Sequence, residues 1–241
     1  KNADVTLATS YTDAENFRKN GANAFCITNG FDVDASTTLS MTEENSKTLP
    51  LSNSTTKFTL SYIGVLEQLR NPEILWETLN ILVQENADFK NDFELKFVGR
   101  LDDKILQKIE SSALKNNLTN LGYQTHDVAL KHMQDSTVLL MTNFPQESSK
   151  GIIPGKIFEY LATGKTILSF GPKDADVEKI LIETKAGKHF GYNEKENLKN
   201  FILESYQNWK SGTLNQNAEN IEQFSRKNLT QKLVDLMNKW F

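Results

Sequence analysis

The stretch from Gly151 to Lys165, which reads GIIPGKIFEYLATGK, places anion-binding residue types at the start of a predicted helix. Proline has no N–H to leave unpaired at a helix start, so Pro154 fits there, and Gly155 lets a ligand approach the backbone. The unpaired N–H groups and the dipole of a helix start favour a phosphate. Lys156 adds a positive charge that the dipole disfavours, so it requires an anionic partner or solvent. Together these residues predict a phosphate site.

Glu159 follows Gly155 by four residues, so the two share one stripe of the predicted helix. A carboxylate about one turn beyond a phosphate site can accept two hydrogen bonds from a ribose diol. The same spacing also fits an ordinary solvated glutamate paired with Lys156 or Lys165. Spacing does not separate these two interpretations, and both stay open.

A second loop, from Gly64 to Pro72, carries Arg70 just before another predicted helix. A guanidinium in this place can bind a diphosphate through two parallel hydrogen bonds. An ordinary surface arginine that makes a cap or a salt bridge fits the position equally well.

Two further loops carry weaker candidates. Arg100 repeats the arrangement of Arg70 after the next strand, but Asp102 and Asp103 can neutralise it locally. Tyr123 follows a third strand, where its ring fits either a contact with a nucleobase or a place in the core.

The sequence contains none of the motifs that mark several other kinds of binding or catalytic site. The chain has no G-x-G-x-x-G motif, no P-loop and no nucleophile elbow; the P-loop-like ATGKT at 162–166 follows a helix and precedes a strand, which is the wrong order. Its histidines (His126, His132 and His189) are too few and too scattered for a metal site. We therefore expect neither a metal nor a cofactor.

Composition and charge argue against some classes of ligand and favour one cellular compartment. The 241 residues are 38% hydrophobic, which allows a substantial core, and the net charge of −4 argues against nucleic acid as a ligand. No apolar run reaches the roughly 18 residues that a membrane-spanning helix needs, and the start of the chain lacks a signal peptide. The single cysteine, Cys26, fits a reducing compartment, so we expect a cytoplasmic protein.

Strands and helices alternate from residue 57 onward, which predicts an α/β fold with a Rossmann-like parallel sheet of about six strands and helices on both faces. Ligands of such sheets bind at the carboxyl ends of the strands. We expect strands at 57–63, 93–98, 118–123, 137–141, 166–170 and 188–190, and helices at 72–85, 102–115, 126–134, 154–163, 174–184, 193–209 and 218–240.

The chain changes character before residue 57. Residues 4–8 and 24–28 resemble two strands around a short helix, which suggests that 1–35 is the end of a preceding domain. Residues 36–56 are polar and predict a linker or a long loop. We therefore divide the remaining chain into a nucleotide-sugar-binding domain at 57–216 and a C-terminal helix at 217–241.

Taken together, these segments resemble the C-terminal, donor-binding domain of bacterial family-4 (group 1) glycosyltransferases, which have the GT-B fold. The most specific match is GIIPGKIFEYLATG at 151–164, and SYIGVLEQLRNP at 61–72 resembles the glycine-rich loop that opens the same domain. ITNGFD at 27–32 resembles the segment before the interdomain linker, and the residues from Phe224 onward resemble the final helix that returns to the N-terminal domain. The resemblance spans nearly the whole chain.

The resemblance implies a retaining transfer of a sugar from a nucleotide donor to a glycan, lipid or other acceptor, without a metal. It assigns Glu159 to the donor ribose, and Arg70 and Lys156 to the diphosphate. The Gly64 loop and the amides from Ile153 through Pro154 to Gly155 would support the phosphate or the sugar. It also implies that the chain needs an N-terminal acceptor domain, that it is inactive alone, and that peripheral membrane association would run through that domain.

The chain departs from the family pattern in two places, and the first favours an alternative, a non-catalytic nucleotide-binding module of the same fold. Many members carry a second glutamate, eight positions before the ribose glutamate, where this chain has Gly151. The family's G-R-L-x-x-x-K loop is here GVLEQLR, so that Arg70 would do the work of the lysine. An epimerase of this fold would need catalytic carboxylates and histidines for which the sequence offers no positions.

Overall fold

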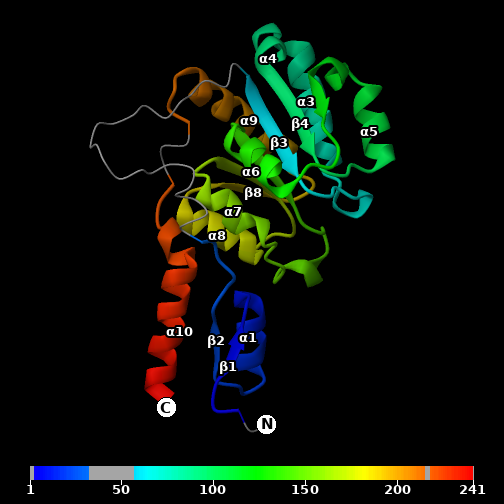
Figure 1. The fold of residues 1–241 in the computed structure, drawn as a ribbon. Helices are drawn as coiled ribbons and strands as arrows, with labels where there is room; N and C mark the ends of the chain where they lie inside the picture. Colours follow the sequence, from blue (N-terminus) through cyan, green and yellow to red (C-terminus); the bar gives the residue numbers. More distant parts are fainter. Residues whose placement is uncertain (1–2, 33–56, 215–217, 241) are drawn as a thin grey trace, which may run out of the picture.

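The structure is a computed structural model that describes residues 3–32, 57–214 and 218–240. Its main sheet has six parallel strands in the order β5-β4-β3-β6-β7-β8 (Figure 1), which confirms the predicted Rossmann-like α/β fold. The strands are β3 (Phe58–Ile63), β4 (Phe93–Val98), β5 (Leu118–Asn120), β6 (Val138–Thr142), β7 (Thr166–Phe170) and β8 (Gly187–Phe190).

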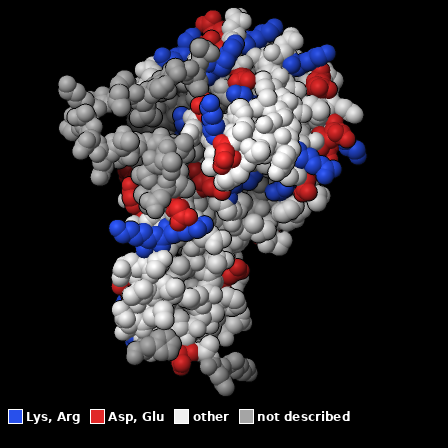
Figure 2. All heavy atoms as spheres, viewed as in Figure 1, with Lys and Arg blue, Asp and Glu red and all other residues white. Residues whose placement is uncertain are grey.

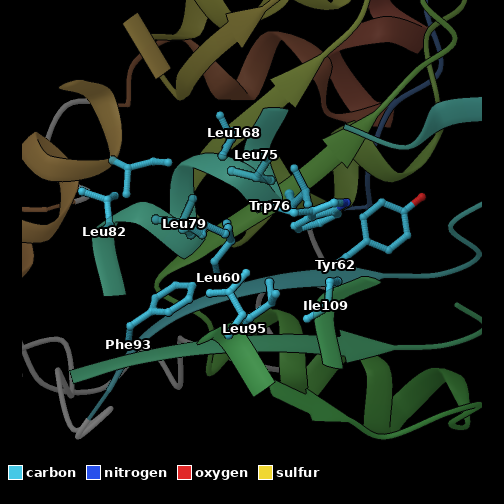
Figure 3. Close-up of a cluster of buried hydrophobic side chains, with 14 of the residues drawn as sticks. Leu60, Tyr62, Leu75, Trp76, Leu79, Leu82, Phe93, Leu95, Ile109 and Leu168 are labelled. Carbon is cyan, nitrogen blue, oxygen red and sulfur yellow. The ribbon is translucent and has the colours of Figure 1, made fainter. Parts of the chain in front are cut away.

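Helices cover both faces of this sheet. One face packs against α3, α5 and α9, and the other against α6, α7 and α8. Figure 3 shows the first face, where Leu75 and Leu79 of α3 lie over Leu60 and Leu95 of the strands. The helices of this domain are α3 (Glu73–Glu85), α4 (Ala87–Asp92), α5 (Asp103–Glu110), α6 (His126–Gln134), α7 (Lys156–Ala162), α8 (Asp176–Thr184) and α9 (Lys195–Lys210).

A smaller unit lies away from the main sheet. Its two parallel strands, β1 (Thr6–Ala8) and β2 (Ala24–Cys26), flank α1 (Tyr11–Lys19), as the sequence predicted. In Figure 1 the last helix, α10 (Arg226–Trp240), runs beside this unit. A short parallel bridge pairs Phe31, after β2, with Ser225, which precedes α10.

A buried carboxylate fastens the small unit to the main domain. Asp176, at the start of α8, is fully buried and accepts hydrogen bonds from the backbone N–H and the hydroxyl of Thr12, at 2.9 and 2.8 Å. Its own N–H donates to the carbonyl of Lys150, in the loop after β6. One residue therefore contacts α1, α8 and that loop.

Several predicted boundaries were wrong. The helix expected at 102–115 ends at Glu110, because the hydroxyl of Ser112 caps a separate 3₁₀ turn (Ala113–Asn117). The final helix, expected from residue 218, begins at Arg226, because the hydroxyl of Ser225 accepts from the N–H of Asn228. Helix α4 was not predicted, and β5 ends three residues early.

The predicted domain boundaries remain predictions. Most of the expected N-terminal piece at 1–35 lies within the described residues, whereas the polar segment at 36–56 lies outside them. Across the described parts of the chain, no helix is both long and apolar enough to cross a lipid bilayer.

Candidate functional site

The strand order changes direction between β3 and β6, and we call the space outside the carboxyl ends of these two strands the crevice. From these two neighbours the chain winds outward in opposite directions, to β4 and β5 on one side and to β7 and β8 on the other. Loops at such a point diverge and leave room for a ligand. The loop after β3 carries Gly64 and Arg70, and the loop after β6 leads to Lys156 at the start of α7. The fold thus brings both predicted phosphate loops to one place.

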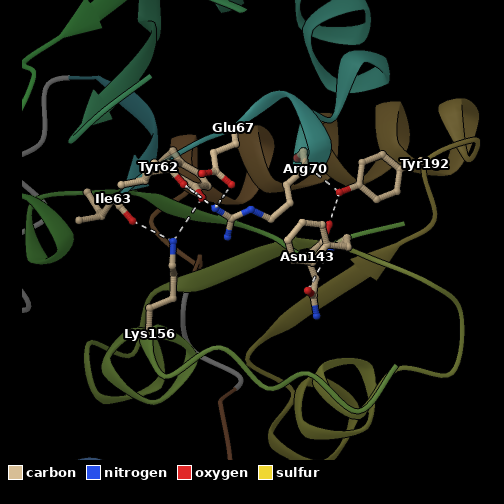
Figure 4. Close-up of polar contacts among 9 residues, drawn as sticks. Tyr62, Ile63, Glu67, Arg70, Asn143, Lys156 and Tyr192 are labelled. Carbon is tan, nitrogen blue, oxygen red and sulfur yellow. Dashed lines mark hydrogen bonds and ion pairs between the residues drawn. The ribbon is translucent and has the colours of Figure 1, made fainter. Parts of the chain in front are cut away.

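Lys156 lies at the centre of this crevice (Figure 4). Its Nζ donates to the carbonyl of Ile63 at 3.0 Å and to the hydroxyl of Tyr62 at 3.4 Å, and lies 4.4 Å from the centre of the Tyr62 ring. Gly64 leaves room for this ammonium, since a Cβ there would lie 3.3 Å from Nζ, and its φ of +118° favours glycine. No carboxylate pairs with Lys156 among the described residues, so its charge is not neutralised.

Arg70 ends a short 3₁₀ helix (Gln68–Arg70) at the other side of the crevice. One terminal nitrogen donates to the carbonyl of Val65 at 3.0 Å and lies 3.4 Å from the carboxylate of Glu67. The guanidinium lies 5.4 Å from the centre of the Phe144 ring, and its buried Nε has no hydrogen-bond partner among the residues that the structure describes. Since Glu67 is 57% exposed and its contact is long, it holds Arg70 only weakly.

The start of α7 is open on its outer side. Gly155 is exposed, and a Cβ there would meet nothing within 4 Å, so the backbone is accessible. Within the described part of the chain, no side chain caps this helix start. Ile153 packs against the core beside the open backbone, while Pro154 accepts a hydrogen bond from the N–H of Ile157.

Glu159 is exposed in the first turn of α7. It forms no hydrogen bond or ion pair with any residue that the structure describes, so the pairing with Lys156 or Lys165, one of the two interpretations, is absent. The other interpretation, in which this carboxylate serves a ligand, remains a prediction.

Gly151 lies against the small unit. A Cβ on Gly151 would lie 3.2 Å from both the hydroxyl oxygen of Ser10 and the Cβ of Thr12. A side chain at this position would therefore require Ser10 and Thr12 to shift by a few tenths of an ångström.

Tyr123 and Arg100 lie farther from the crevice, after β5 and β4. Tyr123 is 88% exposed, so its interpretation as a core residue was wrong. Arg100 is exposed too, and no ion pair joins it to Asp102 or Asp103 within the described chain. Asp102 instead caps α5 by accepting from the N–H of Lys104.

Tyr192 and Asn143 belong to the crevice, but neither was among the residues predicted for the site. The hydroxyl of Tyr192 donates to the carbonyl of Asn143 at 2.5 Å and lies 3.4 Å from the carbonyl of Arg70 (Figure 4). Burial raises the pKa of Tyr192 above its ordinary value, so the hydroxyl keeps its proton. A tyrosine just after an edge strand was the only available signal.

No group of three or more histidine, cysteine or carboxylate side chains in the described residues is arranged to hold a metal ion. His189 is buried instead, between the hydroxyl of Ser169 at 3.0 Å and the carbonyl of Pro172 at 3.1 Å. Burial lowers its pKa.

Solved structures resemble the chain in fold although sequence comparison detects nothing. No protein-family model and no curated protein matches the sequence. HepE from Anabaena, solved with UDP-glucose, matches with a TM-score of 0.68 at 19% identity over 98% of this chain and 64% of HepE. A mutant of TarM from S. aureus, solved with UDP and other ligands, matches with a TM-score of 0.67 at 18% identity, over 98% of this chain and 44% of TarM.

A third match is WaaG, a glycosyltransferase involved in lipopolysaccharide biosynthesis, with a TM-score of 0.58 at 12% identity over 93% of this chain and 61% of WaaG. The chain thus spans between 44% and 64% of the length of these three proteins. Over the part that it spans, the chain has the fold of the GT-B glycosyltransferases.

Proposed function

We propose that this chain is the donor-binding part of a retaining glycosyltransferase that uses a nucleotide sugar. One observation carries the proposal: two cations meet at the crevice, and the charge of Lys156 has no carboxylate partner within the described residues. The buried, unpartnered Nε of Arg70 points to the same need for an anionic ligand.

In this proposal, Lys156 and Arg70 bind the diphosphate, and Glu159 binds the ribose diol. The amides from Ile153 to Gly155 support the sugar or the phosphate, and the exposed ring of Tyr123 is the candidate for the nucleobase. A guanidinium and an ammonium bind phosphate oxygens strongly. These charges take the place of a metal, so addition of EDTA or MgCl₂ should leave the affinity for the nucleotide unchanged.

Exposed apolar side chains on the small unit and α10 favour a further domain that packs against them. Parallel sheets are normally covered on both faces, and a two-stranded sheet is marginally stable by itself. Leu7 of β1, Phe17 of α1, and Met237 and Trp240 of α10 are 42–50% exposed. In Figure 2 this part of the surface is mostly uncharged. We propose that an acceptor-binding domain covers it in the whole protein, and that the chain alone does not transfer sugar.

Nucleotide titration tests the site. UDP, GDP and ADP sugars would each be titrated while the melting temperature is followed; uridine nucleotides come first, because HepE and TarM were solved with them. A charge-assisted pair of hydrogen bonds is worth about 1.5–3 kcal/mol, so Glu159→Ala should weaken binding about 10-fold or more. Glu110→Ala, an exposed glutamate that ends α5, is the control. If no nucleotide stabilises the protein, the proposal fails.

The packing of Gly151 favours the second candidate, a non-catalytic nucleotide-binding module. A Cβ on residue 151 would lie only 3.2 Å from side-chain atoms of Ser10 and Thr12, so the second glutamate of the family pattern would be crowded here. The whole protein distinguishes the candidates: a glycosyltransferase releases nucleoside diphosphate from a donor sugar in the presence of acceptor and keeps the anomeric configuration, whereas a binding module releases none.

A further inference from the structure

The loop after β6 is organised by one buried side chain. Asn143 is 4% exposed; its Nδ2 donates to the carbonyl of Ile152 at 2.9 Å, and its Oδ1 accepts from the N–H of Phe144 at 2.9 Å. The amide therefore ties both ends of the segment between Phe144 and Ile152. Its first residue lies against the guanidinium of Arg70, and its last precedes the open backbone at 153–155.

The hydroxyl of Tyr192 holds the backbone of Asn143 from the other side. A phenol has one proton, so the 2.5 Å contact with the Asn143 carbonyl is the main bond, and the 3.4 Å contact with the Arg70 carbonyl is secondary. The ring packs against Phe170 at 5.7 Å, which fixes its direction. One hydroxyl thus reaches both loops of the crevice.

We propose that Tyr192 is a positioning residue, which sets Arg70 against the diphosphate by fixing the loop of Asn143 and Phe144. This inference rests on the proposed function. It follows from the connected contacts: Tyr192 holds Asn143, Asn143 holds Phe144, and Phe144 lies against the Arg70 guanidinium. Tyr192 itself need not touch the nucleotide.

The test removes the hydroxyl alone and compares two ligands. Isothermal titration would give the Kd of the best-binding nucleoside diphosphate among UDP, GDP and ADP, and of the matching monophosphate. Tyr192→Phe should weaken the diphosphate about fivefold or more and the monophosphate less than twofold, because only the diphosphate needs both cations. In an Arg70→Ala background, Tyr192→Phe should have no added effect.

A matched control separates positioning from stability. Tyr206→Phe also removes one hydroxyl, which donates to Asp92 at 2.6 Å on the side of α4 and α9. It should lower the melting temperature comparably and leave both Kd values unchanged.

The possible results distinguish failure of the positioning role from failure of the proposed function. If wild-type protein binds a diphosphate and Tyr192→Phe binds it equally well, or loses both ligands equally, the positioning role is wrong and the site stands. If wild-type protein binds no nucleotide, the proposed function fails, and this inference fails with it.

Discussion

The main sheet and the small unit are both parallel α/β structures, yet they bury their side chains very differently. Every residue of β3 and β6 is buried between two layers of helices. In the small unit, Leu7 is 47% exposed, and α1 is the only helix among the described residues 3–32. Strand pairing alone therefore does not make a complete fold, because burial of both faces of the sheet supplies most of the stability.

The largest expected difference is in core truncation. Leu95 of the main sheet is fully buried (Figure 3), so Leu95→Ala should lower the free energy of unfolding by about 2–5 kcal/mol. Leu7→Ala should cost less than about 1 kcal/mol, because its side chain already meets solvent. Urea unfolding measures both. Equal losses would mean that the small unit is packed as tightly as the main sheet.

The next effect is at the junction of the two regions. Asp176→Asn keeps the shape but replaces one accepting oxygen by a donor, so it should cost about 1–3 kcal/mol. Limited proteolysis should then cut the small unit faster while β3 to β8 stay protected. Asp235→Asn, on the exposed side of α10, is the control. Unchanged cleavage would show that Thr12 and Asp176 do not fasten the unit.

Two glycine substitutions test the packing at the same junction. Gly151→Ala would place a methyl group 3.2 Å from side-chain atoms of Ser10 and Thr12, so it should lower the free energy of unfolding by about 1 kcal/mol. Gly155→Ala meets open space and should leave stability nearly unchanged. Thermal unfolding compares the two variants, and a larger loss for Gly155→Ala would contradict the contact.

The smallest effect is a pH dependence confined to the main domain. All three histidines lie there, and burial lowers the pKa of His189. The unfolded chain binds a proton near pH 6.5 and the folded chain only at lower pH, so this contribution is complete above about 6.5 and is lost as the pH falls. Urea midpoints at pH 7.5 and 5.5 measure it. His189→Gln should flatten the dependence, whereas the exposed His126→Asn should not.

The sequence predicted elements well where periodicity and caps agree. The bounds of β4 and α6 were correct to the residue, because β4 ends just before Gly99 and α6 has Asp127 in its first turn. Helix α4 was missed, since its signal is one capping residue, Asn86, before a mostly polar stretch.

The sequence predicted only those site residues that lie in loops directly after strands. The places of Gly64, Arg70 and Lys156 follow from the rule for carboxyl ends of parallel strands. The link between Tyr192 and Asn143 spans 49 residues and joins a hydroxyl to a backbone carbonyl, which no residue pattern marks. The neutral partners of Lys156, Ile63 and Tyr62, depend likewise on tertiary packing.

The way Lys156 is held has a consequence for the entropy of binding. A lysine side chain carries about 2 kcal/mol of rotamer entropy, which a ligand normally has to remove when it binds. Here the carbonyl of Ile63 and the ring of Tyr62 already fix the ammonium, so folding has removed that freedom beforehand. An arriving anion would meet an ordered charge, and its affinity would lose little to the ordering of this side chain.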